Sequence, residues 1–257
     1  MNAKKQKTNE QRTLDHLQKG FNRSKGLKHL IKAKDPIIFD IGANSGQSLI
    51  EFKSIWPNAT VHSFEPQQEC WEELEGRANH YKEGSVIVNR IGAGSIHNDA
   101  LTFYTHDITK GQSGFHRINT NSVDSMNLSE PLSQNQKKQY EKTLNHKRTV
   151  PIMRLDQYMS ERNIRSASLI KIDTQGYEPE VLEGLGEMLR NVDVILTELM
   201  FYDFYERQLS FSDIEKFLIQ AGYRLYDISH ISKNPMNGRT DWIDVIYLNQ
   251  SLFQKKW

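Results

Sequence analysis

The chain alternates between short apolar runs and longer segments in which apolar residues recur every three or four positions. Short apolar runs bounded by turn residues predict buried strands, and helical spacing predicts amphipathic helices. The predicted strands cover residues 37–41, 60–64, 86–91, 100–105, 150–153, 168–173, 192–198, 223–228 and 242–248. The predicted helices cover residues 45–56, 67–81, 134–145, 155–160, 179–189 and 211–221. This alternation is typical of an α/β fold with a mostly parallel sheet covered on both faces, to which the last strand could add in the antiparallel sense.

Two segments fall outside the alternation. Residues 10–33 carry apolar residues at helical intervals and predict one or two helices, so we divide the chain into an N-terminal part, residues 1–34, and a main domain, residues 35–257. Residues 106–148 form a polar insertion interrupted by breakers such as Gly111, Gly114 and Pro131. Polar segments of this length are usually functional or disordered.

Composition excludes several classes of protein. Lys and Arg number 33 against 32 Asp and Glu, whereas a general nucleic-acid binder normally has a basic excess. Cys70 is the single cysteine, which excludes an intrachain disulfide and fits a reducing compartment. No apolar run approaches the roughly 20 residues of a membrane span, and the basic start at residues 1–12 has no apolar region behind it. We expect a cytoplasmic protein with no nucleic-acid partner.

A strand followed by a glycine turn forms the first candidate site. The apolar run 37–39 ends in Asp40, and Gly42, Ala43, Asn44 and Gly46 follow. Glycines let the backbone approach a ligand closely, and the ends of parallel strands open into the binding crevice of an α/β sheet. The G-x-x-x-G spacing differs from the G-x-G-x-x-G of dinucleotide enzymes, which argues against a nicotinamide cofactor. The simpler alternative is a turn that only joins strand to helix.

Glu65 ends the second predicted strand, about 20 residues beyond the glycine turn. A carboxylate in this place can accept hydrogen bonds from both hydroxyls of a ribose. S-adenosylmethionine has a ribose but no pyrophosphate, so it needs this carboxylate and no phosphate-binding turn. We therefore interpret the first site as a cofactor site, with S-adenosyl-L-methionine as the candidate.

The second candidate site is the segment 169–185, which reads LIKIDTQGYEPEVLEGL. Strand alternation places Lys171 and Asp173 on one side of the sheet, and Asp173 falls at the carboxyl end of the strand. Gly176 permits a turn, and Glu178 follows near the start of the next helix. The structural alternative is a lysine–carboxylate pair beside a capped helix.

Four segments together resemble one family: DIGANSG (40–46), SFEPQ (63–67), IKIDTQGYEPEVLEGL (170–185) and LTEL (196–199). They resemble the FkbM-type S-adenosylmethionine-dependent methyltransferases, over residues 37 to about 248. The resemblance implies a class I, Rossmann-like fold with a seven-stranded, mostly parallel sheet. It also implies methyl transfer to a hydroxyl of a sugar, glycolipid or natural product.

The resemblance further implies roles for individual residues. Asp40, Gly42, Asn44 and Gly46 would hold the methionine part of the cofactor, with Ala43 in the same turn. Glu65 would hold the ribose, and the segment from Ile91 to Ala93 would lie at the adenine. Two features depart from the family pattern, namely Arg90, where alanine is common, and Gly94-Ser95, where an acidic residue is common.

An aliphatic hydroxyl must lose its proton as it attacks the methyl group, which requires a general base. Asp173 is the first candidate base, Lys171 would keep it ionised, and Glu178 and Glu198 are alternatives. The histidines of the insertion, His106, His116 and His146, could serve as base or ligand, although loop histidines are more often solvated. The spacing of the histidines and Cys70 indicates no metal site.

The sequence leaves the acceptor and the assembly open. Aromatic residues gather after the seventh predicted strand, where they could stack on an acceptor, fill the core or form a dimer contact. These are Phe201, Tyr202, Phe204, Tyr205 and Phe211. An RNA methyltransferase, a nicotinamide enzyme and a non-catalytic cofactor-binding relative remain as alternatives. A homodimer is one possible assembly.

Overall fold

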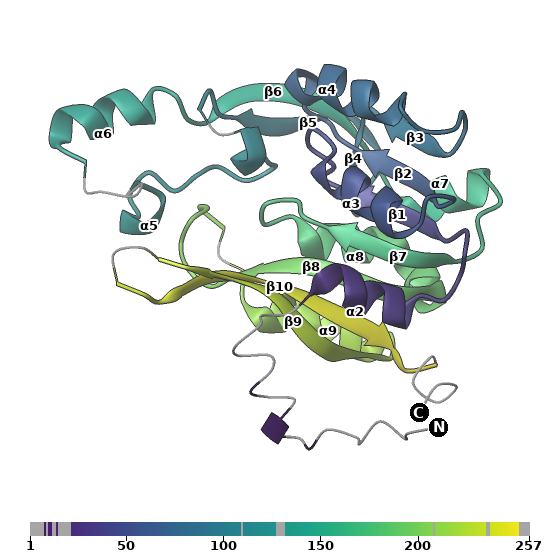
Figure 1. Ribbon diagram of the computed structural model, residues 1–257. Helices are drawn as coiled ribbons and strands as arrows, with labels where there is room; N and C mark the ends of the chain where they lie inside the picture. Colours follow the sequence, from purple (N-terminus) through teal and green to yellow (C-terminus); the bar gives the residue numbers. More distant parts are fainter. Residues whose placement is uncertain are drawn as a thin grey trace.

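A computed structural model describes residues 22–251 except 109, 127–131, 208 and 235–236, together with residues 8, 10, 11 and 14. Within this part of the chain, seven strands form one central sheet in the order β3-β2-β1-β7-β8-β10-β9 (Figure 1). The strands are β1 (Ile37–Ile41), β2 (Thr60–Phe64), β3 (Val86–Asn89), β7 (Ala167–Ile172), β8 (Val192–Met200), β9 (Tyr223–Lys233) and β10 (Thr240–Asn249). The first five strands of this order pair in parallel, whereas β10 runs antiparallel to both neighbours. The predicted α/β fold is confirmed, and the last strand is antiparallel as expected, but it lies between β8 and β9 and not at the edge of the sheet.

Helices cover both faces of this sheet because the inner strands bury side chains on both sides. One face packs Phe39, Ile41 and Phe64 against helices α7 (Leu155–Glu161), α8 (Glu178–Leu185) and α9 (Phe211–Gln220). The other face packs Ile38 and Val61 against helices α2 (Arg23–Leu30), α3 (Gln47–Ile55) and α4 (Gln68–Ala78). The 3-10 helix η2 (Gly186–Asn191) joins α8 to β8. Alternate residues of β1 thus pack into opposite layers, which explains why its residues other than Asp40 are all apolar.

Three predicted strands differ from expectation. Strand β3 ends at Asn89 and not at residue 91. The two-residue strand β4 (Gly92–Ala93) that follows belongs to a second sheet, of order β4-β6-β5. That sheet also contains β5 (Asn98–Thr105) and β6 (His146–Met153). The sequence left the partners of the strands at residues 100–105 and 150–153 unassigned, because hydrophobic alternation identifies strands and not their partners. Strand β6 also begins within the predicted insertion, since His146 to Arg148 pair with Thr105 to Phe103.

The rest of the insertion carries short elements of its own. These are η1 (Lys110–Gln112), α5 (Val123–Met126) and α6 (Gln134–Glu141), and Figure 1 shows α5 and α6 projecting away from the main sheet. Helix α6 begins with a capping box between Ser133 and Gln136, and it ends before the predicted residue 145. A small apolar cluster of Ile118, Met126, Tyr140, Leu144 and Tyr205 joins the insertion to the segment after β8.

The N-terminal part contributes helix α2, which buries Leu27 and Leu30 against the sheet. Arg23 at its start pairs with Glu51 of α3 and with Asp244 of β10 at 3.1 Å. The earlier part of the predicted helical segment lies largely outside the described residues. Every helix in the described part of the chain is too short or too polar to cross a membrane.

Candidate functional site

The glycine turn after β1 approaches the end of β7 so closely that only glycine fits. Gly42 has φ +76°, and a methyl group there would overlap the carbonyl oxygen of Asp173. The backbone N–H groups of Gly42 and Ala43 both donate to the carbonyl oxygen of Phe64, at 3.1 and 3.0 Å. The turn is therefore held between two neighbouring strands, and Gly46 opens helix α3 at its far side.

Glu65 is bound to this turn through the backbone. Its Oε2 accepts from the N–H of Asn44 and its Oε1 from the N–H of Gln67, both at 2.7 Å. The side chain is buried, and burial raises the pKa of Glu65 to about 7, although both backbone donors act in the opposite direction. Each oxygen keeps a lone pair for a further donor. The carboxylate can thus receive two hydroxyl groups without losing its present partners.

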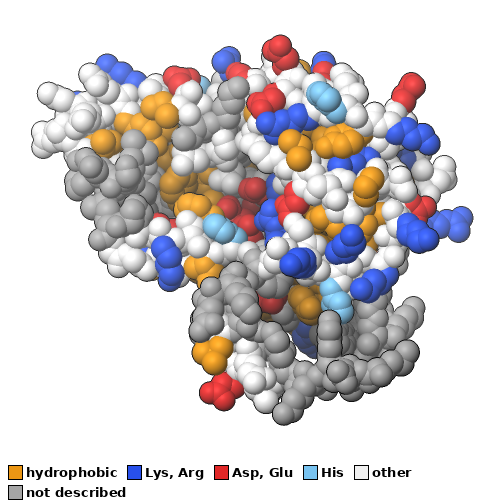
Figure 2. Space-filling model, viewed as in Figure 1, with side chains coloured by type: hydrophobic (Ala, Val, Ile, Leu, Met, Phe, Trp, Pro, Cys, Tyr) orange, Lys and Arg blue, Asp and Glu red, His pale blue; other side chains and the backbone are white. Residues whose placement is uncertain are grey.

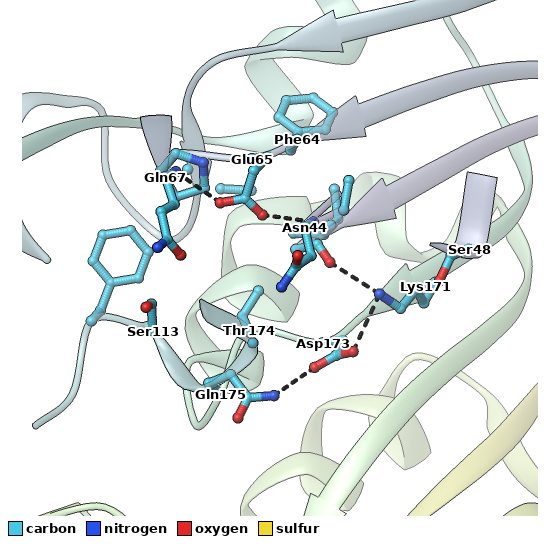
Figure 3. A pocket seen from close by; sticks show the side chains of 18 of the residues that line it. Asn44, Ser48, Phe64, Glu65, Gln67, Ser113, Lys171, Asp173, Thr174 and Gln175 are labelled. Carbon is cyan, nitrogen blue, oxygen red and sulfur yellow. Dashed lines mark hydrogen bonds and ion pairs between the residues drawn. The ribbon is translucent and has the colours of Figure 1, made fainter. Parts of the chain in front are cut away.

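The turn, Glu65 and the end of β7 surround one cavity of about 210 Å³. Its wall includes Gly42 to Asn44, Phe64 to Gln67, Gly92 and Ala93, Phe103, Gly111, Ser113, Phe115, Lys171, and Asp173 to Gln175. Figure 3 shows the labelled side chains of this wall. Figure 2 shows a hollow in this view where acidic side chains gather beside hydrophobic ones. The cavity thus combines the two sites predicted from sequence, and the insertion adds Gly111, Ser113 and Phe115 to its wall.

Lys171 forms the centre of a charged group beneath the turn. Its Nζ lies 3.3 Å from Asp40 Oδ1 and 3.3 Å from Asp173 Oδ2, and it donates to the carbonyl oxygen of Gly42 at 3.0 Å. Burial acts to lower the pKa of Lys171, but Asp173 and Asp40 outweigh it and raise this pKa. Lys171 therefore remains a cation that supports the turn and both carboxylates.

Three residues predicted to hold the cofactor, Asp40, Gly46 and Ile91, do not line the cavity. Asp40 is fully buried and faces Lys171; burial raises the pKa of Asp40, and Lys171 partly offsets this. Ile91 also lies outside the wall, whereas Gly92 and Ala93 belong to it. Asp40 lies near the carboxyl end of β1, as the sequence predicted. The inward direction of its side chain follows from its register opposite Lys171.

Asp173 is the carboxylate best placed to act on a bound molecule. Its side chain is 38% exposed and lines the cavity. Its Oδ2 pairs with Lys171, and its Oδ1 accepts from Gln175 Nε2 at 2.8 Å. Among the described residues of the wall, Glu65 and Asp173 are the two with carboxylates. The arrangement holds a carboxylate between two donors on the cavity wall.

Glu178 serves the turn after β7 instead. Its Oε1 accepts from the backbone N–H of Thr174 at 2.8 Å, the hydroxyl of Thr174 at 3.1 Å and the N–H of Gly176 at 3.3 Å. Glu178 is buried and lies outside the cavity wall, and burial raises the pKa of its carboxyl to about 7. Glu178 therefore stabilises the turn between β7 and α8.

Gln175 belongs to the site and was not singled out from the sequence. Its Nε2 donates to Asp173 and lies 3.4 Å from Glu198 Oε2, while its Oε1 accepts from the hydroxyl of Tyr205 at 2.6 Å. The backbone of Gln175 has φ +58°, which is uncommon for a residue with a side chain. Its place between Asp173 and Gly176 was the available signal, but Tyr205 lies 30 residues away in the chain.

The histidines of the insertion serve other contacts. His106 is buried and accepts from the N–H of Asn145 at 3.1 Å. His116 lies 3.2 Å from Arg207, and His146 lies 3.1 Å from Asp107. Burial lowers the pKa of His106 and of His116 to about 4. Of the described residues that line the cavity, none is a histidine, and no three His, Cys, Asp or Glu side chains in the described part are grouped to hold a metal ion.

The aromatic segment divides into two parts. Tyr205 is buried, and Phe204 packs beside it in the small cluster of the insertion. Phe201 and Tyr202 are exposed, at 42% and 39%. Core packing therefore explains Tyr205, and Phe201 and Tyr202 remain available on the surface.

The fold and the site agree with one family of known proteins. The Methyltransferase FkbM domain matches residues 40–225, which include the glycine turn, Glu65 and the turn after β7. The chain belongs to the FkbM methyltransferase family. The family resemblance predicted from the four sequence segments is confirmed.

Two curated relatives and one solved structure are similar to this chain. The 2-O-methyltransferase NoeI of Sinorhizobium fredii is 28% identical over 70% of this chain and 70% of its own length. The hexuronic acid methyltransferase AglP of Haloferax volcanii is 23% identical over 65% of this chain and 56% of its own length. The FkbM methyltransferase structure from Methylobacillus flagellatus has a TM-score of 0.52 at 14% identity and covers 84% of this chain. This chain spans only 44% of that one, so the likeness concerns the shared fold.

Proposed function

We propose that this FkbM-family protein is an S-adenosylmethionine-dependent O-methyltransferase that acts on a hydroxyl group of a sugar, glycolipid or natural product. One observation carries the proposal: Asp173, paired with Lys171, lines the same cavity as the glycine turn and Glu65. A cofactor held by the turn and Glu65 would therefore lie beside a candidate base.

The residues of the cavity suit the parts of S-adenosylmethionine. Glu65 has lone pairs left for the two ribose hydroxyls, while Asn44 and Gln67 hold its carboxylate in place. The Oγ of Ser113 is buried and lacks a hydrogen-bond partner within the described residues, and Ser113 lines the cavity. The rings of Phe103 and Phe115 lie edge to face on the same wall, with their centroids 5.2 Å apart. They offer an apolar surface to the adenine ring of the cofactor.

When bound, the cofactor supplies a methyl group on a sulfonium centre. The protein then has to align an acceptor oxygen in line with that methyl group and receive the proton of the hydroxyl. Asp173 receives the proton as the oxygen–carbon bond forms. Lys171 and Gln175 hold the two carboxylate oxygens of Asp173 in place.

The two curated relatives support the acceptor class. One is named a 2-O-methyltransferase and the other a hexuronic acid methyltransferase, so oxygen and carbohydrate acceptors both occur among proteins similar to this chain. The nearly balanced charge of the chain, with 33 basic and 32 acidic residues, speaks against an RNA acceptor.

A labelled-methyl transfer assay tests the proposal. The protein is incubated with methyl-labelled S-adenosylmethionine and a panel of methyl hexosides, hexuronic acids, short oligosaccharides, aliphatic alcohols and total RNA. We expect base-stable label on a hydroxyl-bearing acceptor, and none on a matched acceptor whose hydroxyls are blocked. Label found only on RNA would overturn the acceptor class, and calorimetry that detects no binding of S-adenosylmethionine would overturn the function.

A further inference from the structure

We propose that Gln175 is a positioning residue for methyl transfer: Tyr205 fixes its side-chain amide, and the amide holds Asp173 toward the acceptor and apart from Glu198. This inference rests on the proposed function, because it assigns Gln175 a role through the candidate base. It adds two residues, Gln175 and Tyr205, whose effect on the reaction passes through a hydrogen-bond chain.

The direction of the amide is determined by its neighbours. Tyr205 has one hydroxyl proton, and its oxygen lies 2.6 Å from Gln175 Oε1 and 3.1 Å from the carbonyl oxygen of Gln112. Burial raises the pKa of Tyr205 well above its usual value, so this hydroxyl stays a donor. With Oε1 as the acceptor for Tyr205, the Nε2 group points at Asp173, as Figure 3 shows for the Gln175–Asp173 bond. The reverse orientation would place two oxygens against each other.

The amide lies between two carboxylates of neighbouring strands. The parallel register pairs Ile172 with Thr197, so the next residues, Asp173 and Glu198, are also neighbours. In the antiparallel register of β8 and β10, Glu198 lies opposite Asp244. Like charges at adjacent positions repel each other, and Gln175 Nε2 lies 2.8 Å from Asp173 and 3.4 Å from Glu198. The neutral amide of Gln175 therefore lies between the two carboxylates and within reach of both.

Charged groups on every surrounding element act on this pair. Burial and then Asp173, Glu178 and Asp244 raise the pKa of Glu198 well above its usual value, with Lys171 opposing them. Lys171 of β7 pairs with Asp173 and also with Asp40 of β1, so one cation serves both carboxylates. Arg23 of α2 neutralises part of the charge by pairing with Asp244, and it also pairs with Glu51 of α3. Since acidic groups predominate, losing the amide donor makes proton uptake by the carboxylates easier.

The hydrogen-bond chain that leads to Asp173 begins in the polar insertion. Ile118 forms a bridge with Tyr205, the N–H of Asn119 donates to the carbonyl oxygen of Phe204 at 2.9 Å, and the N–H of Glu206 donates to that of Arg117 at 2.8 Å. These backbone contacts place the Tyr205 ring in the cluster of the insertion. Through Tyr205 and Gln175, the insertion is therefore connected to Asp173.

Two variants test the proposal with the full chain. Gln175→Met keeps the length of the side chain and removes the amide, while Tyr205→Phe removes a single oxygen. Tyr81→Phe, at a half-buried tyrosine outside the cavity wall, is the matched control. The assays use methyl-labelled S-adenosylmethionine with the acceptor from the panel above that wild type methylates fastest. Calorimetry of S-adenosylmethionine binding confirms that each variant is folded.

We expect kcat to fall roughly tenfold to a hundredfold in Gln175→Met, because small displacements of a base cost this much, and roughly threefold to tenfold in Tyr205→Phe, the worth of one hydrogen bond. The acid limb of the kcat profile should move to higher pH in both variants, since a donor to the carboxylate form has been lost or loosened. The affinity for S-adenosylmethionine should stay within about twofold, and Tyr81→Phe should resemble wild type.

An NMR measurement needs no acceptor. In wild type the side-chain NH₂ of Gln175, assigned with Gln175→Met, should give two well-separated signals with slowed solvent exchange. In Tyr205→Phe these signals should move toward the values of a free glutamine. An unchanged acid limb in Gln175→Met, or a free Gln175 amide in wild type, would overturn the inference while leaving the proposed function intact. Absence of transfer by wild type to any hydroxyl would instead overturn the proposed function.

Discussion

Lys171 Nζ lies 3.3 Å from Asp40 Oδ1, and the carboxylate of Asp40 has no exposed surface. This ion pair joins the two central strands directly below the glycine turn, where Lys171 also supports the carbonyl oxygen of Gly42. Because Asp40 is fully buried and the Lys171 side chain is only 12% exposed, the carboxylate of Asp40 depends on this cation for charge compensation.

Removing the cation alone should be costly. Lys171→Met leaves Asp40 buried without a counter-charge, and we expect the free energy of unfolding to fall by about 3–5 kcal/mol. The double variant Asp40→Asn/Lys171→Met removes both charges and should recover much of this loss. Urea unfolding of wild type, both single variants and the double variant gives the coupling. Additive losses would show that the pair does not act as a unit.

Asp173→Asn should separate chemistry from binding. The amide keeps the size of the side chain but cannot accept the proton, so we expect kcat to fall roughly a hundredfold or more. The dissociation constant for S-adenosylmethionine should change by less than about threefold, since the base contacts the acceptor. Asp99→Asn, at a side chain that is 97% exposed, is the control. Full turnover by Asp173→Asn would exclude Asp173 as the base.

Cofactor binding should depend on pH through Glu65. Burial raises the pKa of Glu65 to about 7, so its carboxylate is mostly protonated at pH 6 and mostly ionised at pH 8. Ribose hydroxyls donate to the ionised form, and we expect binding of S-adenosylmethionine to tighten about tenfold over this range. Glu65→Gln should bind more weakly and lose this step. The product S-adenosylhomocysteine, titrated in parallel, controls for ionisation of the ligand's amino group.

Burial of Glu178 should appear as a pH dependence of stability. Its pKa is raised from 4.5 to about 7 in the folded protein, so the folded state binds more protons than the unfolded state between these values. Stability therefore falls as pH rises from 4.5 to 7, by on the order of 3 kcal/mol for this group. Glu178→Gln stays neutral and should flatten this slope in urea titrations. An equally steep slope in the variant would assign it to other groups.

The approach of the glycine turn to β7 can be tested with two matched substitutions. Gly42 and Gly84 have similar φ angles, +76° and +73°, but a methyl group on Gly84 would meet nothing within 4 Å. Gly84→Ala should cost only the left-handed backbone term, about 1–2 kcal/mol. Gly42→Ala also overlaps Asp173 and should cost at least about 3 kcal/mol or prevent folding. Thermal unfolding compares the two, and equal losses would mean that the turn can move away from β7.

The sequence alone determined the features that depend on local patterns. Period-two and helical repeats located the strands and most helices, and the order of strands and helices predicted the parallel sheet. The glycine turn, Glu65 and the pair Lys171–Asp173 could be assigned because strand ends and alternation follow directly from residue order. For the same reason the family resemblance was visible before any coordinate.

Tertiary structure decided what depends on register and on distant contacts. Strands β4, β5 and β6 form a second sheet because they pair with one another. Hydrophobic alternation along the sequence cannot specify this pairing. Asp40 turned out to face Lys171 because the register of β1 and β7 places them opposite each other. Gln175 gained its partner through Tyr205, 30 residues away and held by the insertion. Local sequence carries the periodicity of each element, but the burial and pairing of a polar side chain depend on which distant segment packs against it.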